Sequence, residues 1–221
     1  MSSVPTCHHA VSEQMPLNLQ VSWCDRLLSA ILLLLLSPLL LGIAIVTVVL
    51  SGKSPLIAHR RVGQYGSDLW VLKFRTMWRR SGAPPKVGDV LSIEFIDDEI
   101  GPGRKCPADG RVVSRFARFC RRHSLDELPQ IFQVVAGHMS FVGPRPVTKS
   151  ELDTIYGANA VEILRAKPGL AGLWQVSGRN RLTSADRRAL DLKWVRTQSL
   201  SLYVVILLRT IPEVVYGGDT W

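Results

Sequence analysis

The sequence predicts a mostly helical α+β protein that is held at a membrane by its N-terminal part. Residues 27–50 carry no charged side chain and are almost wholly apolar. Apolar and polar residues then alternate within residues 55–77, and helical periodicity returns after residue 112. With 221 residues, the chain is long enough for one domain with a sizeable core.

The composition favours anionic partners. Lys and Arg number 27 against 18 Asp and Glu, which gives a formal net charge of +9. Such a charge suits nucleic acid, an anionic membrane surface or a phosphorylated substrate. No nucleic-acid-binding motif accompanies it, so we expect a membrane rather than a nucleic acid as partner. The four cysteines have no zinc or disulfide-framework spacing, which indicates reduced thiols.

Residues 27–50 form the predicted membrane helix, after a flexible tail at 1–26. Their 24 residues would give a helix about 36 Å long, and a bilayer core needs about 20 residues. Ser37-Pro38 interrupts this segment, since proline removes a helical hydrogen bond. Two topologies follow, a kinked span or a re-entrant hairpin, and hydropathy by itself favours the span. The downstream basic residues place 51–221 in the cytoplasm.

A β-hairpin should follow the membrane segment. Residues 55–62 and 68–77 alternate like strands, and the glycines between them indicate a turn. Lys73 and Arg75 then lie two residues apart on one face of the second strand. Residues 81–110 are rich in proline, glycine and charge, which predicts a long surface loop or a small insertion.

Short helices and rigid loops make up the rest of the prediction. Helical spacing marks a basic and aromatic helix at 112–122, an apolar helix at 129–136, a helix at 185–198, and an interfacial or core helix at 200–216. Two prolines bracket Arg145 and fix its guanidinium in space, which suits an anionic ligand. A glycine-rich turn at 168–172 leads towards Arg179.

The acidic pair Asp126-Glu127 follows the basic Arg121-Arg122. Ser124 and Glu127 have the spacing of a capping box, so a helix cap explains the pair as well. Lys73, Arg75, Arg121, Arg145 and Arg179, however, are cations that a diphosphate would need. Among them, one carboxylate could hold a divalent ion and the other could attack phosphorus. Neighbouring side chains on a helix diverge by about 100°, which favours separate roles.

Four motifs in order resemble those of the bacterial sugar transferases, the monotopic polyprenyl-phosphate phosphoglycosyl transferases. They are KFRTM at Lys73–Met77, SLDELPQ at Ser124–Gln130, MSFVGPRP at Met139–Pro146, and Pro168-Gly169 with GLWQVSGR at Gly172–Arg179. The resemblance covers residues 27–218. The chain departs from the family at Gln133, where Asn is common, and at His138, where Asp is common, and its 81–110 loop is longer.

The resemblance implies an enzyme that moves a sugar-1-phosphate from a UDP-sugar to a membrane polyprenyl phosphate, such as undecaprenyl phosphate, in exopolysaccharide or glycoconjugate synthesis. Asp126 would be the nucleophile and carry a covalent phospho-sugar, Glu127 would bind Mg²⁺, and Arg121 and Arg145 would hold phosphates. Transfer by direct attack and a non-catalytic membrane scaffold remain the alternatives.

The resemblance also bears on topology and location. It implies a re-entrant helix broken at Ser37-Pro38, which reverses the preference from hydropathy. Residues 51–221 would then form a catalytic domain on the cytoplasmic face of the bacterial inner membrane. A homodimer stays an open alternative.

Overall fold

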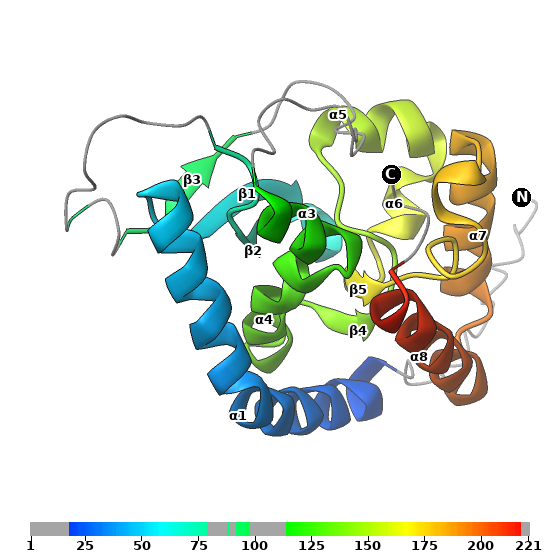
Figure 1. The fold of residues 1–221 in the computed structure, drawn as a ribbon. Coiled ribbons are helices and arrows are strands. Elements are labelled where there is room, and N and C mark those ends of the chain that lie inside the picture. Colours follow the sequence, from blue (N-terminus) through cyan, green and yellow to red (C-terminus); the bar gives the residue numbers. More distant parts are fainter. Residues whose placement is uncertain (1–17, 79–87, 89–91, 98–113, 218–221) are drawn as a thin grey trace, which may run out of the picture.

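The structure is a computed structural model that describes residues 18–78, 88, 92–97 and 114–217. Helices surround two small sheets (Figure 1). The elements are α1 (Asn18–Ser51), β1 (Leu56–Val62), β2 (Asp68–Phe74), β3 (Glu94–Ile96), α3 (Arg115–Arg122), α4 (Ile131–Val135), β4 (Ser140–Val142), α5 (Lys149–Glu151), α6 (Ala160–Ile163), β5 (Gly169–Ala171), α7 (Ser184–Arg196) and α8 (Leu200–Val215). This confirms the prediction of a mostly helical α+β fold.

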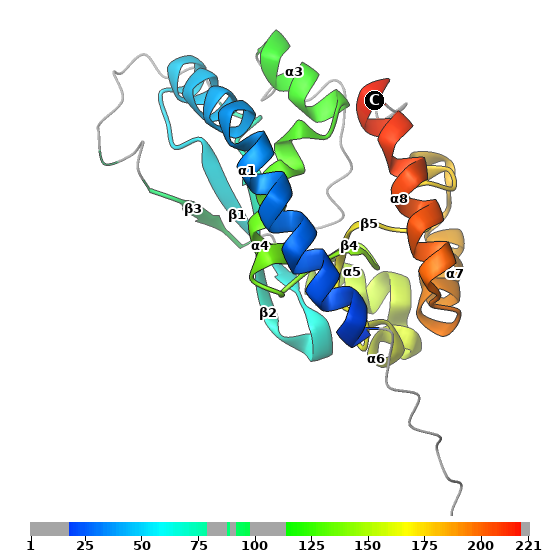
Figure 2. The same cartoon turned by 90° about the horizontal axis from the view of Figure 1, so that it is seen from below.

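Helix α1 is long, apolar and bent. Within its Ser22–Ser51 part, an 18-residue window has a mean hydropathy of 2.8, and only 11% of that window is buried. Figure 1 shows two arms that meet at a bend, and Figure 2 shows α1 crossing α4. Pro38 lies inside the helix, and the Ser37 hydroxyl donates to the Leu34 carbonyl at 2.8 Å. We attribute the bend to Pro38, because proline removes a backbone hydrogen bond and crowds the preceding turn.

The first turns of α1 are fixed to the domain by polar side chains. Asp25 is 5% exposed and accepts hydrogen bonds from Ser140 Oγ, at 2.6 Å, and from the Tyr203 hydroxyl. Lys167 Nζ donates to Ser22 Oγ at 2.9 Å. The helix therefore begins at Asn18, within the predicted flexible tail at 1–26, because these contacts order its first turns.

The predicted hairpin is present and gains a third strand. Strands β1 and β2 pair antiparallel, from Leu56 opposite Phe74 to Val62 opposite Asp68. Strand β3 comes from the 81–110 segment and pairs parallel with β1. Phe95 of β3 packs edge-on against Trp70, with ring centroids 5.1 Å apart. Residues Glu94–Ile96 of this segment therefore form a strand of the sheet, where a loop or small insertion was expected. Asp98 and Glu99 lie outside the described residues.

Strands β4 and β5 form a short parallel pair that brings two glycines into contact. Ser140 lies opposite Gly169, and Val142 opposite Ala171. A Cβ atom at Gly143 would overlap the Lys167 carbonyl oxygen, and one at Gly169 would overlap the Gly143 nitrogen. Glycine is required at both positions because the backbones approach too closely for any side chain.

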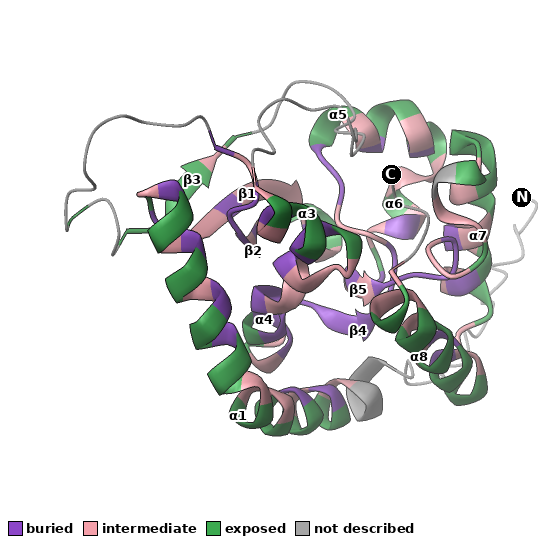
Figure 3. Cartoon of the chain, in the orientation of Figure 1, coloured by how far each residue is buried: buried purple, intermediate pink, exposed green. Residues whose placement is uncertain are grey.

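The main core joins the hairpin, the β4–β5 pair and the C-terminal helices. Its fully buried members include Val71, Val134, Met139 and Ile206. Helix α8 places Ile206 in this core, whereas several apolar residues on its other face are exposed: Leu200, Val204, Val205, Leu208, Ile211 and Val215. Figure 3 shows the same exposure along the outer faces of α1 and α8. Both helices therefore present apolar surface outwards.

Candidate active site

The acidic pair lies in a 3₁₀ helix, Leu125–Gln130, that begins after a left-handed residue. Ser124 has φ 55° and its side chain makes no capping hydrogen bond. The predicted capping box is therefore not formed, although Thr148 with Glu151 and Thr183 with Asp186 do form such boxes. The side chain of Glu127 turns instead towards Lys73 of the hairpin, so a helix cap does not account for this carboxylate.

Glu127 is held by cations. Its Oε1 atom lies 3.0 Å from Lys73 Nζ and 3.7 Å from an Arg145 guanidinium nitrogen. The Lys73 and Glu127 side chains are 16% and 15% exposed, so this ion pair is largely shielded from water. Charge pairs of this kind fix a carboxylate in one position.

Asp126 is buried beside this ion pair. It is 3% exposed, and its negative charge contributes to raising the pKa of the Cys120 thiol to about 11, although burial of the thiol is the larger cause. Leu125 and Leu128 flank the pair and pack against the cluster that contains Leu40 of α1. The pair therefore sits between α1 and the cationic face of the hairpin.

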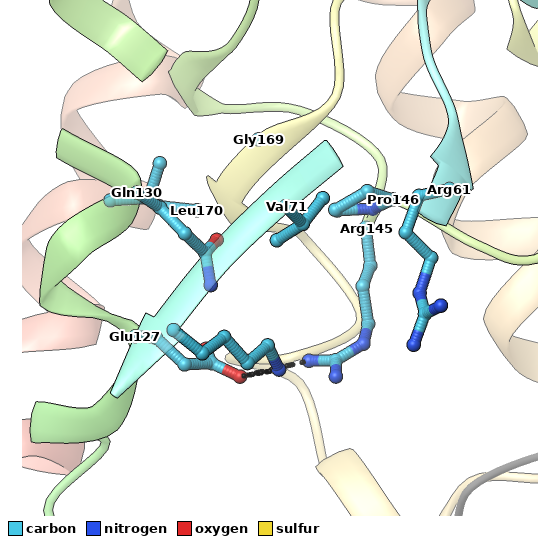
Figure 4. Close-up of a pocket in the computed structure, with 9 residues that line it drawn as sticks. Arg61, Val71, Glu127, Gln130, Arg145, Pro146, Gly169 and Leu170 are labelled. Carbon is cyan, nitrogen blue, oxygen red and sulfur yellow. Dashed lines mark hydrogen bonds and ion pairs between the residues drawn. The ribbon is translucent and has the colours of Figure 1, made fainter. Parts of the chain in front are cut away.

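A pocket opens next to Glu127 (Figure 4). The residues that line it are Arg61, Val71, Lys73, Glu127, Gln130, Arg145, Pro146, Gly169 and Leu170. Its ionisable side chains are three cations and one carboxylate, so they carry a net charge of +2. A pocket of this charge suits a ligand with two or more negative charges, such as a diphosphate.

Backbone contacts explain why Arg145 points into this pocket. The Val62 amide donates to the Val147 carbonyl at 2.9 Å, which ties the end of β1 to the residues after Arg145. The Gly169 amide donates to the Pro144 carbonyl at 2.9 Å on the other side. The backbone is thus anchored on both sides of Arg145, and the predicted hold of its guanidinium on an anionic ligand stays a prediction.

Three of the predicted cations lie outside the lining of this pocket. Arg75 is buried and donates to the Ser54 carbonyl at 2.7 Å and to Glu94 at 2.6 Å. It separates from Lys73 because β2 ends at Phe74, so the strand alternation stops before it. Arg121 is buried in the last turn of α3. Their roles in phosphate binding stay predictions.

Arg179 belongs to the loop before α7 rather than to the pocket wall. It adopts φ 47°, and its Nε atom lies 3.3 Å from Glu213 of α8 and donates to the Gln175 carbonyl at 3.2 Å. This arginine therefore joins the loop to the C-terminal helix. Its predicted phosphate contact stays a prediction as well.

Sequence reasoning missed Arg61 and Gln130 as pocket residues. The hairpin register provides a signal for Arg61. It pairs with Leu69, and Lys73 pairs with Ile57, so both cations fall on the same face of the sheet. Gln133, a departure from the family pattern, has a structural contact: its amide accepts from the Leu72 nitrogen at 3.0 Å and donates to the Trp70 carbonyl at 2.8 Å.

The protein side chains at the site could hold Mg²⁺ only together with oxygens of a bound ligand or water. Among the described residues, no group of three His, Cys, Asp or Glu side chains gathers closely enough to hold a metal. Mg²⁺ commonly takes one or two protein carboxylates and fills its other positions with water and substrate phosphates. Glu127, which lines the pocket, is a suitable carboxylate for such a site.

Known proteins resemble this chain over most of its length. A sequence profile described as "Bacterial sugar transferase" matches residues 18–217. The chain is 42% identical to the exopolysaccharide production protein ExoY of Rhizobium meliloti over 196 residues, which is 86% of this chain and 83% of that protein.

Two further relatives carry names that state a reaction. The undecaprenyl-phosphate galactose phosphotransferase of Salmonella typhimurium is 36% identical over 86% of this chain and 39% of that protein. The UDP-glucose:undecaprenyl-phosphate glucose-1-phosphate transferase of Caulobacter vibrioides is 34% identical over 89% of this chain and 70% of that protein.

Proposed function

The chain belongs to the bacterial sugar transferase family, and we propose that it transfers a sugar-1-phosphate from a UDP-sugar to a polyprenyl phosphate such as undecaprenyl phosphate. The products are a polyprenyl-diphosphate-sugar and UMP, at the first membrane step of exopolysaccharide or glycoconjugate synthesis. Its relatives are phosphoglycosyl transferases, which gives the enzyme class. The observation that carries the proposal is the cationic pocket around Glu127, next to the buried Asp126.

The proposed reaction has two displacements at one phosphorus atom. A carboxylate oxygen of Asp126 bonds to the phosphorus that bears the sugar, and the bond from that phosphorus to UMP breaks. An oxygen of the polyprenyl phosphate then bonds to the same phosphorus, and Asp126 leaves. Lys73 and Arg145 lie around Glu127 and would stabilise the charge of the transferred phosphate in both steps.

Glu127 would hold Mg²⁺ in this scheme. When bound, the ion would neutralise charge on the diphosphate and favour departure of UMP. The Lys73 ammonium, now 3.0 Å from Glu127, would turn towards the phosphate oxygens as the carboxylate binds the metal. Neighbouring positions in the chain thus serve separate purposes, the nucleophile at Asp126 and the metal ligand at Glu127.

The membrane arrangement that we propose is re-entrant, with both ends of α1 on the cytoplasmic face of the inner membrane. Both arms of α1 contact the same folded domain, through Asp25 with Ser140 in the first arm and through Leu40 and Ile43 with Phe74 in the second. A helix whose two arms touch one domain cannot easily place its ends on opposite sides of a bilayer. The bend of α1 supports the same arrangement.

The exposed apolar face of α8 fits the same picture, because it would lie at the lipid surface. The acceptor lipid never leaves the membrane, so its phosphate would reach the site along this side of the domain. A catalytic domain held against the headgroups by α1 and α8 would therefore meet its acceptor without a transport step.

The test is a screen of UMP release over a panel of UDP-sugars, with the full chain in detergent or nanodiscs, polyprenyl phosphate and Mg²⁺. We expect Asp126→Asn to lower turnover by at least about 10³-fold, because the nucleophile is lost. Asp153→Asn, at an exposed position, should leave turnover unchanged. Full activity of Asp126→Asn would contradict the proposal.

A half-reaction separates the two versions of the mechanism. With radiolabelled UDP-sugar and no lipid, the covalent version yields UMP and a labelled protein in equal amounts. The direct version yields neither, yet turns over normally when lipid is added. Removal of Mg²⁺ with EDTA should stop UMP release in both versions, and should be reversed by added Mg²⁺.

A further inference from the structure

Arg61 extends the cationic pocket beyond the residues that surround Glu127. It lies in β1 and lines the pocket together with Lys73 and Arg145. In Figure 4, Arg145 lies between Glu127 and Arg61, and the Arg61 guanidinium points in the same direction as that of Arg145. The pocket therefore offers one cationic region at Glu127 and a second one at Arg61.

The backbone holds these two arginines in register. Val62, the residue after Arg61, donates its amide proton to the carbonyl of Val147 at 2.9 Å. Val147 is two residues after Arg145, so this backbone contact ties the strand that carries Arg61 to the loop that carries Arg145. Arg60, the neighbour of Arg61, belongs to the other face of the sheet and pairs with Asp68 and Asp97 at 3.0 and 3.1 Å.

We propose that Arg61 binds the nucleotide-side phosphate of the donor, the phosphate that leaves as part of UMP. This inference rests on the proposed function. The phosphorus under attack must lie at Asp126, where Lys73 and Arg145 approach Glu127. A diphosphate carries a second phosphate beyond the first, and Arg61 is the pocket cation on that far side.

The acceptor lipid is the other source of phosphate in this reaction. A polyprenyl monophosphate attacks the phosphorus held by Asp126 from the side that UMP has left, so its own phosphate would follow the UMP phosphate into the same region. Binding of UMP in the absence of lipid therefore tests the donor role of Arg61 directly.

The experiment measures UMP binding to the purified full-chain protein by equilibrium dialysis with radiolabelled UMP, together with KM for donor and for lipid. A hydrogen bond to a charged group is worth enough that we expect Arg61→Gln to weaken UMP binding by about 10- to 100-fold. The donor KM should rise similarly. Arg61→Lys, which keeps the charge but loses the planar fork, should lie in between.

Arg60→Gln is the matched control, since it removes an exposed guanidinium from the same strand on the opposite face. We expect wild-type UMP affinity in this variant. Circular dichroism and the melting temperature report whether each variant folds. If Arg61→Gln does not fold, the UMP affinity of Arg61→Lys is the test.

The outcomes separate this inference from the proposed function. Wild-type UMP affinity in both Arg61 variants overturns the inference and leaves the proposed function standing, as long as the wild-type protein turns over. A rise in lipid KM with an unchanged donor KM and an unchanged UMP affinity overturns it too, because Arg61 would then hold the acceptor alone. If the wild-type protein neither binds UMP nor releases it from any UDP-sugar, both proposals fail.

Discussion

The buried Asp25 allows the attachment of α1 to the rest of the domain to be tested directly. Asp25 is 5% exposed and accepts two hydrogen bonds, from Ser140 and from the Tyr203 hydroxyl. Tyr203→Phe removes one donor and keeps the ring, which packs against Trp194 with centroids 6.2 Å apart. A hydrogen bond to a charged group is worth about 1.5–3 kcal/mol, so the variant should lose about that much stability.

Thermal denaturation measures this loss. For a chain of this size, 1 kcal/mol corresponds to a shift of about 2–4 °C in Tm, so Tyr203→Phe should lower Tm by roughly 3–12 °C. The assay is circular dichroism at 222 nm of detergent-solubilised protein near neutral pH. Tyr216→Phe makes the same chemical change at a side chain that is 77% exposed, and its Tm should equal that of the wild type within about 1 °C.

Two results would refute this reasoning. One is a Tyr203→Phe variant that melts within about 1 °C of the wild type, because the hydroxyl would then add nothing to the attachment of α1. The other is an equal loss of Tm in Tyr216→Phe, which would mean that any tyrosine hydroxyl in this chain has the same effect.

Two further predictions concern the domain below α1. Gly169→Ala should lower both Tm and UMP release, because the new Cβ atom would overlap the Gly143 nitrogen and shift the loop that carries Arg145. Gly42→Ala is the control and should lower neither, because no atom lies within 4 Å of its new Cβ. Asp191 is fully buried, and burial raises its pKa from 3.8 to about 7, so the folded state keeps a proton that the unfolded state has lost. Tm should therefore fall as pH rises from about 4 to about 7, and Asp191→Asn should reduce this dependence of Tm on pH. An equal dependence in both proteins would contradict the raised pKa of Asp191.

The parts of the fold that local patterns encode could be predicted from the sequence. The hairpin followed from alternation and glycines, and the bend of α1 agrees with the expected break at Ser37-Pro38. Helix α7 matches the periodic segment at 185–198 within two residues. In each of these elements, neighbours in the chain determine the structure through short-range sterics and periodic burial.

The parts that depend on distant contacts could not be predicted. Strand β3 forms only because β1 offers it an edge, and the pairing of β4 with β5 joins segments that are far apart in sequence. Arg75 looked like a companion of Lys73, but Glu94, in the segment taken for a loop, binds it instead. The alternation of a strand indicates on which face a side chain lies. It does not indicate which carboxylate, distant in sequence, will pair with that side chain.

The packing of α1 against the acidic segment links catalysis to the thickness of the bilayer. Leu125 and Leu128, on either side of the acidic pair, pack with Leu40 and Ile43 of the second arm. In the proposed topology, the depth of that arm sets the height of Asp126 above the lipid headgroups. A membrane with shorter or longer acyl chains would raise or lower the arm and carry the nucleophile with it. Lipid composition would thus act on the reacting groups themselves.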